Sequence, residues 1–260
     1  MAHATPLRLL PDGAALWATD ARARVAVVGS DARGFLHRMS TNKVQDLAAG
    51  EGRLNALVTD KGRFVDLVHH LDRGVAGVLL VGGRGRGAAL LAWLDRFIFT
   101  EDIDLRELSD VGSCAEIAGA RAPAIVDALV AGAAALPPWG FAEQDGRLAV
   151  RGFDRCAASG VRVPSFLVVD LERPAVLAAL SAAGAAVIDD ADAEALRIAA
   201  GVPGEGSEIV EAYNPLELAL HDAIHWGKGC YIGQEVIARR DTYAKVGAKA
   251  LQGPHHVAKK

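Results

Sequence analysis

Hydrophobic and polar positions alternate along much of the first hundred residues, which predicts β-strands with one buried face. Residues 14–28 are expected to form a hairpin that turns near 20–23. A second hairpin is expected to join strands at 53–59 and 64–71 through the turn at 60–62, where a glycine follows Asp-Lys. Antiparallel pairing should therefore dominate this part of the chain.

Helical periodicity interrupts these strands at two places. Ser30 or Asp31 is a candidate N-cap for a helix that reaches Met39. After a further strand at 75–81, the pattern over 87–97 predicts another helix. The amino-terminal part is therefore expected to be a sheet with helices.

Strand and helix patterns alternate from about residue 100 to residue 189, which predicts a second α+β unit. The expected elements are strands at 103–108, 113–118, 148–152 and 165–170 and helices at 122–131 and 174–183. This order is compatible with a ferredoxin-like layer. The elements expected beyond it are a helix from Asp189 or Asp190 through Ala200, a helix at 216–223, a strand at 223–226 and a helix at 234–240.

Length, composition and charge limit which classes of protein the chain can belong to. A chain of 260 residues that is 51% hydrophobic can bury a substantial core and is long enough for two domains. The formal net charge of −4, with no long basic run, makes direct nucleic-acid binding an unfavoured interpretation. Since the chain has no apolar run of about 18 residues and no signal pattern, we expect a cytoplasmic protein without a membrane partner.

Three cysteines, Cys114, Cys156 and Cys230, are odd in number and widely spaced, which suits free thiols in a reducing compartment. Cys230 has the most informative surroundings, because Lys228 precedes it by two positions and a helix starts shortly after it. An ammonium and a helix N-terminus both favour thiolate over thiol. Cys230 is therefore a candidate reactive group, with a buried, inert thiol as the alternative, whereas Cys114 and Cys156 are expected to be structural.

Two other patterns suggest ligands less strongly. Residues 78–91 (VLLVGGRGRGAALL) place glycines between a strand and a helix, but their spacing fits no phosphate-binding motif. Arg84 and Arg86 are interpreted as solvated, or as contacts for an anionic ligand tail. His221 and His225 have the spacing of two metal ligands on a helix, but the expected strand at 223–226 separates them, so no metal site is predicted.

The stretch from Lys228 to Glu235 (KGCYIGQE) resembles the signature of the YgfZ family, folate-binding proteins of iron–sulfur cluster maturation that are similar to the T-protein of glycine cleavage. Four further segments fit the same resemblance. They are FLHRMSTN (35–42), DKGRFVDL (60–67), the R-x-x-x-G-V-P of Arg197, Gly201, Val202 and Pro203, and the P-L-E of Pro215, Leu216 and Glu217. The resemblance covers about residues 25 to 250.

The resemblance implies an α+β, T-protein-like (GcvT-like) architecture with antiparallel sheets. In it, residues 7–99 and 189–237 form the folate-binding core and residues 100–188 form the ferredoxin-like unit. The family ordinarily adds a C-terminal β-barrel. Only a short remnant at 238–260 follows here, so we expect that barrel to be absent or incomplete.

The resemblance also implies site residues. Cys230 is the expected functional thiol, and the signature around it comprises Lys228, Gly229, Tyr231, Gly233, Gln234 and Glu235. The expected folate contacts are Asn42, Asp66, Arg197 and Glu217, with slot walls from Trp17, Phe64, Trp226 and Tyr231. Bland alternatives remain open: Asp66 as a solvent-facing strand residue, Asn42 with Thr41 as a helix C-cap, Arg197 as a partner of Asp192 or Glu194, and Glu217 as a helix cap.

The implied function is binding of tetrahydrofolate or a one-carbon derivative in support of iron–sulfur cluster assembly or repair, with client or assembly proteins as partners. A folate-dependent aminomethyltransferase is the first alternative. Two acids of the T-protein are replaced by Val65 and Ala199, so we expect no true aminomethyltransferase, because acid–base catalysis needs a titratable group in reach. An accessory protein of tRNA modification is the other alternative.

Overall fold

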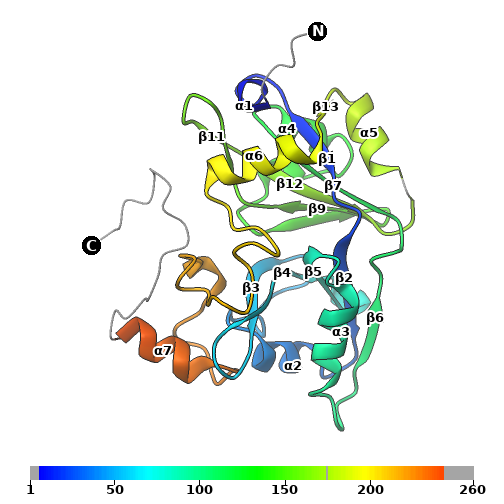
Figure 1. Ribbon diagram of the computed structural model, residues 1–260. Coiled ribbons are helices and arrows are strands. Elements are labelled where there is room, and N and C mark those ends of the chain that lie inside the picture. The colour runs from blue at the N-terminus through cyan, green and yellow to red at the C-terminus, as the bar shows by residue number, and fades with distance from the viewer. Residues whose placement is uncertain (1–5, 174, 243–260) are drawn as a thin grey trace. The chain divides into compact units, whose positions relative to one another are not determined.

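The computed structural model describes residues 6–173 and 175–242. Contacts divide these residues into two units (Figure 1). Of the described residues, the first unit holds those up to Ala21 together with Asp110–Val202, and the second holds Arg22–Ser109 together with 203–242. The expected remnant at 238–260 lies outside the described residues from 243 onward.

The second unit is built on a five-stranded antiparallel sheet in the order β3-β4-β5-β2-β6. Its strands are β2 (Arg22–Val28), β3 (Gly52–Val58), β4 (Phe64–Asp72), β5 (Val78–Arg84) and β6 (Asp104–Glu107). The predicted hairpin is confirmed, since β3 pairs with β4 around the turn that contains Gly62. A register shift between Leu57 and Val58 marks a bulge close to this turn.

Two helices, α2 (Ala32–Met39) and α3 (Gly87–Asp95), pack against one face of this sheet (Figure 1). Both present apolar side chains at helical spacing, which join the inward residues of the strands in one core cluster. The members are Phe35, Leu36, Met39, Leu90 and Leu94 from the helices and Val25, Val27, Leu57, Val68, Val78 and Leu80 from the strands. The unit also contains the short 3₁₀ helices η1 (Gly74–Ala76) and η3 (His221–Ala223) and the helix α7 (Gln234–Thr242).

The first unit is built on a six-stranded sheet in the order β13-β1-β7-β12-β9-β8. Its strands are β1 (Ala15–Ala18), β7 (Ser113–Ala118), β8 (Phe141–Gln144), β9 (Arg147–Arg151), β12 (Ser165–Asp170) and β13 (Ala186–Val187), and β10 (Arg155–Cys156) pairs with β11 (Arg162–Val163) separately. The helical segments are α1 (Pro6–Leu9), α4 (Ala122–Asp127), η2 (Ala133–Ala135), α5 (Val176–Ala182) and α6 (Asp190–Ala200). The succession β7-α4-β9-β12-α5-β13 is ferredoxin-like, with β1 inserted between β13 and β7.

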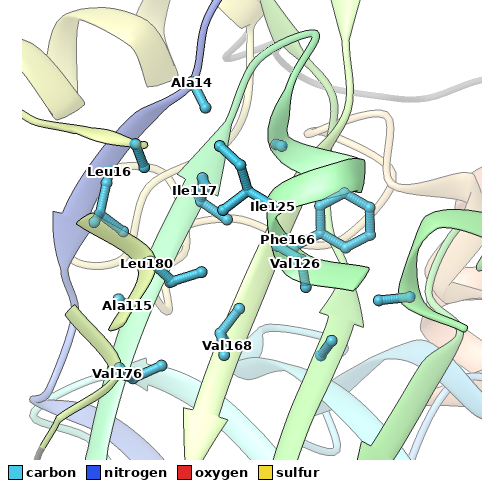
Figure 2. Close-up of a cluster of buried hydrophobic side chains, with 14 of the residues drawn as sticks. Ala14, Leu16, Ala115, Ile117, Ile125, Val126, Phe166, Val168, Val176 and Leu180 are labelled. Atoms are coloured by element: carbon cyan, nitrogen blue, oxygen red, sulfur yellow. The ribbon is translucent and has the colours of Figure 1, made fainter. Parts of the chain in front are cut away.

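The core of the first unit lies between its sheet and the helices α4 and α5 (Figure 2). Ile125 and Leu180 come from these helices, and Leu16, Ile117 and Phe166 come from the strands. On the other face, Leu10, which directly follows α1, and Leu196 of α6 belong to a second cluster. Burial on both faces explains why every residue of β7 and β12 is buried and neither strand alternates between buried and exposed positions.

The predicted hairpin over 14–28 is wrong. β1 pairs with β7 and β13 in the first unit, whereas β2 pairs with β5 and β6 in the second. The chain therefore changes units between Ala18 and Arg22, and β6, expected in the ferredoxin-like unit, belongs to the other sheet. α6 likewise belongs to the first unit, whereas it was assigned to the folate-binding core. Alternation identifies a strand but carries no information about its distant partner.

The helix predicted at 216–223 and the strand at 223–226 are also not formed. Turns occupy 211–219 and lead to η3, because Ala219 adopts a left-handed backbone with φ 55°, which an α-helix cannot contain. Ile224 is extended but pairs with no strand of the described chain. Across residues 6–173 and 175–242 both sheets are open, with no closed barrel and no helix of the length and apolarity needed to cross a bilayer.

Candidate functional site

A pocket of about 550 Å³ opens in the second unit, between β4, the end of β5, α3 and the segment 205–211. Its apolar wall includes Phe64 and Trp93 together with Ile209. Charged side chains complete the lining, and they are Asp66, Arg84, Arg86, Arg96, Glu205 and Glu211. An apolar slot with a few placed polar groups has the properties of a small-molecule site.

Asp66 is the most deeply placed of these charged groups. It lies on β4 with 2% of its surface exposed, so the interpretation of a solvent-facing strand residue is wrong. Its carboxylate accepts hydrogen bonds from the backbone N–H of Leu67 at 2.8 Å and of Gly83 at 3.2 Å. Burial nevertheless dominates and raises the pKa of Asp66 from 3.8 to about 6. This carboxyl group can therefore hold or release a proton near neutral pH.

The Gly82-Gly83 pair in β5 makes room for this carboxylate. A Cβ atom at residue 82 would lie 2.7 Å from Oδ2 of Asp66, and one at residue 83 would lie 3.1 Å from Oδ1. Neither distance suits a real side chain, so the glycines are required by close approach and not by a phosphate-binding turn. The glycine-rich motif at 78–91 is thus a strand, turn and helix, as expected, that shapes a pocket around a carboxyl group.

Two residues of this site, Arg22 and Glu205, were missed in the sequence. Arg22 at the start of β2 donates from Nη1 to Oε1 of Glu205 at 3.0 Å and to the carbonyl oxygen of Gly82 at 3.2 Å. The two residues are 183 positions apart and belong to no motif. The available signal was a charged residue two positions after the matched G-V-P, which does not indicate a partner.

Arg84 and Arg86, which the sequence suggested as contacts for an anionic ligand tail, lie at the rim of the pocket. Arg86 is exposed, donates to the carbonyl oxygen of Val65 at 2.9 Å, and lowers the pKa of Asp66 through its charge. Arg96 follows α3 and lies 5.8 Å from the ring centroid of Phe97. The pocket therefore combines a buried carboxyl group with a cationic rim.

Lys228 of the signature lies elsewhere in the second unit and has a structural role that was not expected. Its ammonium donates to the backbone carbonyl oxygens of His37, Ser40 and Asn42 at 2.5, 2.6 and 2.8 Å. These carbonyls surround the C-terminal end of α2, where helices leave acceptors unsatisfied. The backbone N–H of Ile232 adds a bond to the carbonyl of Arg38, so the signature loop is fastened to this helix end.

Burial of Lys228 lowers its pKa from 10.5 to about 7. Its Nζ also lies 5.1 Å from the ring centroid of Tyr231, whose own pKa burial raises to about 12. The N–H groups of Lys228 thus donate hydrogen bonds to carbonyl oxygens. This corrects the expectation that the ammonium chiefly favours the thiolate of Cys230. Cys230 itself is exposed on the loop between Lys228 and α7, as is Gly229, and Trp226 is exposed just before Lys228.

Gly233 ends this loop at a position where only glycine fits. Its φ is 78°, and a Cβ atom there would lie 2.5 Å from the carbonyl oxygen of Thr59. α7 begins at Gln234, and its Val236 and Ile237 lie beside Gly62 of the β3–β4 turn. Glu235 is exposed and pairs with Arg239 one turn later at 2.5 Å. These signature residues therefore shape and support the loop.

The other expected folate contacts do not gather around the pocket. Asn42 donates from its amide to the carbonyls of Leu54 and Asp222 at 2.9 and 2.8 Å, and it accepts from the N–H of Lys43. It is thus a buried link between loops. Ser40 and not Thr41 is the C-cap of α2.

Glu217 and Arg197 are also held by protein groups. Glu217 accepts from the N–H of Asn214 at 2.9 Å and pairs with Arg63 and Arg240 at 3.3 and 2.7 Å, which resembles a capping box on a turn. Arg197 lies on α6 of the first unit, where it forms a forked pair with Glu194 at 2.6 and 2.7 Å and donates to the carbonyl of Val202. Of the four expected contacts, only Asp66 lines the pocket.

The aromatic residues that were expected to form the walls of the folate slot also do not all lie at the pocket. Phe64 lines the pocket, whereas the ring of Tyr231 lies under Lys228 and Trp226 is 48% exposed. Trp17 is buried in the first unit, with the guanidinium of Arg155 5.8 Å from its ring centroid. Cys114 and Cys156 are buried.

The matches to known proteins agree with this architecture. Residues 7–147 match the family model of the GCVT N-terminal domain, so the chain belongs to that family. The fold is likewise GcvT-like: the crystal structure of the glycine cleavage system aminomethyltransferase T from Bartonella henselae superimposes with a TM-score of 0.75, covering 90% of this chain and 64% of that one at 20% identity.

Curated relatives extend the similarity along the chain. A proposed chloroplastic transferase of Arabidopsis thaliana is 28% identical over 233 residues, which are 85% of this chain and 51% of that protein. An aminomethyltransferase of Rubrobacter xylanophilus is 28% identical over 220 residues, which are 83% of this chain and 58% of that enzyme. The chain thus spans about half the length of the curated relatives that it matches.

Proposed function

We propose that this chain is a folate-binding, aminomethyltransferase-like protein and that the pocket beside Asp66 binds tetrahydrofolate or a one-carbon derivative. The observation that carries the proposal is a buried carboxyl group in the wall of a pocket with an apolar side and an arginine rim. A reduced pterin ring offers N–H donors and an apolar face, and the glutamate tail of a folate is anionic. Those properties complement Asp66, the Phe64–Trp93 wall and the arginines respectively.

The chemistry available at the pocket is proton transfer at Asp66. With a pKa of about 6, its carboxyl group is largely ionised at pH 7 and can accept a hydrogen bond from a ring nitrogen. It can also take up a proton with little free-energy cost. The ring supplies the one-carbon chemistry, while Asp66 orients a nitrogen and holds its proton.

Complete aminomethyl transfer is not part of the proposal. One position that the resemblance assigns to an acid is Val65, which lines the pocket but has no titratable group. The other is Ala199, an exposed residue of α6 in the first unit. The name of the relative from Rubrobacter xylanophilus, an aminomethyltransferase, supports an aminomethyltransferase-like protein, and the two missing acids favour a binding protein over a transferase.

Calorimetric titration with tetrahydrofolate tests the binding proposal. We expect about one molecule to bind per chain, as for a single preformed pocket. Asp66→Asn should weaken binding about tenfold or more, because a hydrogen bond to a charged group is worth roughly 1.5 to 3 kcal/mol. Asp60→Asn, in the exposed β3–β4 turn, is the control and should bind like the parent. Absence of binding at millimolar ligand overturns the proposal.

We further infer that the chain belongs to the YgfZ branch and supports iron–sulfur cluster assembly or repair in client enzymes. The specific observation is the exposed thiol of Cys230 on a loop that Lys228 and Gly233 hold in one shape. An accessible thiol in a fixed loop can meet a partner protein or a reactive intermediate.

Complementation tests this second proposal. In cells that lack their own version of the protein, Cys230→Ser should keep folate binding and fail to restore a cluster-dependent activity. Cys156→Ser, at a buried position, is the matched control for loss of a thiol. Equal complementation by parent and Cys230→Ser would remove the thiol from the function. A deficit confined to thiolated tRNA would instead favour the accessory role in tRNA modification.

A further inference from the structure

Asp66 has a carboxylate neighbour in the pocket that no sequence motif indicated. Glu205 lines the same pocket, and its Cγ methylene and the Asp66 carboxylate both lie beside Gly83. A Cβ atom at Gly83 would lie 2.8 Å from Cγ of Glu205 and 3.1 Å from Oδ1 of Asp66. Because Cγ of Arg86 would also lie 3.1 Å from that Cβ atom, glycine at residue 83 allows all three side chains to approach the same point.

Arg22 fixes the position of Glu205. One nitrogen of its guanidinium, Nη1, bonds both Oε1 of Glu205 and the carbonyl oxygen of Gly82, the residue that also makes room for Asp66. The side chains of Arg22 and Glu205 are 17% and 24% exposed, so the pair is largely shielded from water. Such a pair is better placed to hold a carboxylate in one geometry than an exposed ion pair is.

The two carboxyl groups also interact electrically. The charge of Glu205 raises the pKa of Asp66, in the same direction as burial, and the charge of Arg86 acts against both. The remaining charged groups on the pocket lining are Arg84, Arg96 and Glu211. Two nearby carboxylates favour a shared proton, or a ligand that brings N–H donors to both of them.

Resting on the proposed function, we propose that Glu205, positioned by Arg22, is a second ligand-contacting carboxyl group that pairs with Asp66 across Gly83 and accepts hydrogen bonds from the ring N–H groups of the bound folate. The pair gives the pocket two acceptors at one end and arginines on its rim. It partly offsets the acid that is missing at Val65, because a carboxylate reaches the same pocket from a distant segment of the chain.

The contact is tested by affinity for tetrahydrofolate. Glu205→Gln should weaken binding about tenfold, since an ionised acceptor is replaced by a neutral one. Glu51→Gln is the matched control, because it removes one negative charge from an exposed side chain of the same unit that does not line the pocket. It should change the affinity by less than about twofold. If melting shows that Glu205→Gln is poorly folded, Glu205→Asp, which keeps the charge and shortens the reach, should show the same loss.

The pairing is tested without any ligand, by ¹³C NMR titration of the Asp66 carboxyl carbon. Glu205→Gln should lower the titration midpoint of Asp66, and Glu51→Gln should leave it in place. If the parent binds no tetrahydrofolate, the proposed function fails while this titration still decides the pairing. If the parent binds but Glu205→Gln keeps the parent affinity, Glu205 only anchors its loop, and the inference is wrong while the proposed function stands.

Discussion

The pocket beside Asp66 and the loop that carries Cys230 both belong to the second unit, and they use buried charge in opposite ways. In the pocket, burial raises the pKa of Asp66 to about 6 and leaves its carboxyl group facing open space. In the loop, burial lowers the pKa of Lys228 to about 7, but its amino group is already hydrogen-bonded to three backbone carbonyl oxygens.

The comparison shows that a perturbed pKa alone does not identify a functional group. Lys228 is perturbed because it closes the end of α2, which is a structural task. Asp66 is perturbed beside a pocket that a ligand can enter, so its ionisation is available for chemistry. If this distinction is right, changes in the loop should act on stability, and changes in the pocket should act on binding.

The largest expected effect comes from Lys228→Met. The change keeps an unbranched chain but leaves the buried carbonyls of His37, Ser40 and Asn42 without their donor. We expect the free energy of unfolding in urea at pH 7 to fall, because three buried acceptors without partners cost roughly 1 to 3 kcal/mol each, which outweighs the desolvation cost that is relieved when the ammonium is removed. Lys61→Met, at an exposed turn position, should change it by less than about 0.5 kcal/mol. Equal effects of the two variants would mean that the hydrogen bonds of Lys228 to the end of α2 do not stabilise the protein.

Asp66→Asn should separate binding from stability. The folded protein holds the Asp66 proton up to about pH 6, whereas the unfolded chain releases it near 3.8. The stability contributed by this group is therefore complete below 3.8 and is lost as the pH rises to about 6. Relative to the parent, Asp66→Asn should gain roughly 3 kcal/mol across this window. Urea denaturation of both proteins at pH 3.5 and pH 7 measures the difference.

The contradicting result for Asp66→Asn is a constant difference from the parent at both pH values. That outcome would mean that Asp66 titrates normally in the folded protein. It would also remove the argument that this carboxyl group can exchange a proton near neutral pH.

A glycine comparison tests the shape of the loop. Gly233→Ala should lower stability by about 2 kcal/mol, since φ at this residue is 78° and a Cβ would meet the carbonyl of Thr59. Gly229→Ala, four residues earlier in the same loop, meets nothing within 4 Å and should be nearly neutral. Thermal melting of both variants measures the contrast. Similar losses would show that the loop tolerates no side chain anywhere.

The smallest effect is expected from Cys230→Ser. The thiol is exposed on its loop, so its replacement should change stability by less than about 0.5 kcal/mol. Iodoacetamide should label Cys230 before the buried Cys114 and Cys156, because only this thiol is accessible. Equal labelling of all three by peptide mapping would contradict the exposed loop.

The sequence predicted those parts of the fold that depend on neighbouring residues. The β3–β4 hairpin and the helices α2, α3, α6 and α7 were expected close to their observed limits, because their patterns, caps and turn residues are local. The pairing of β1 with β7 was not expected, since nothing within 14–18 shows which distant strand it joins. Likewise the positive φ of Ala219, which ends a helical pattern, has no signal in its residue type.

The candidate site divides in the same way. Asp66 and the Gly82-Gly83 pair stand in recognisable segments, and both were considered from the sequence alone. Glu205 and Arg22 could not be, because they meet across 183 positions. The role of Lys228 was misjudged because spacing of two residues suggested proximity to the thiol, whereas the long side chain reaches the carbonyls at the end of α2.

A crystal structure with bound tetrahydrofolate is the most direct test of the central claim that this pocket is the folate site. We predict that the pterin ring occupies the pocket beside Phe64 and Trp93, with a ring N–H group within hydrogen-bond distance of the Asp66 carboxylate. A ring bound away from Asp66, or no bound folate at a saturating concentration, would contradict the account.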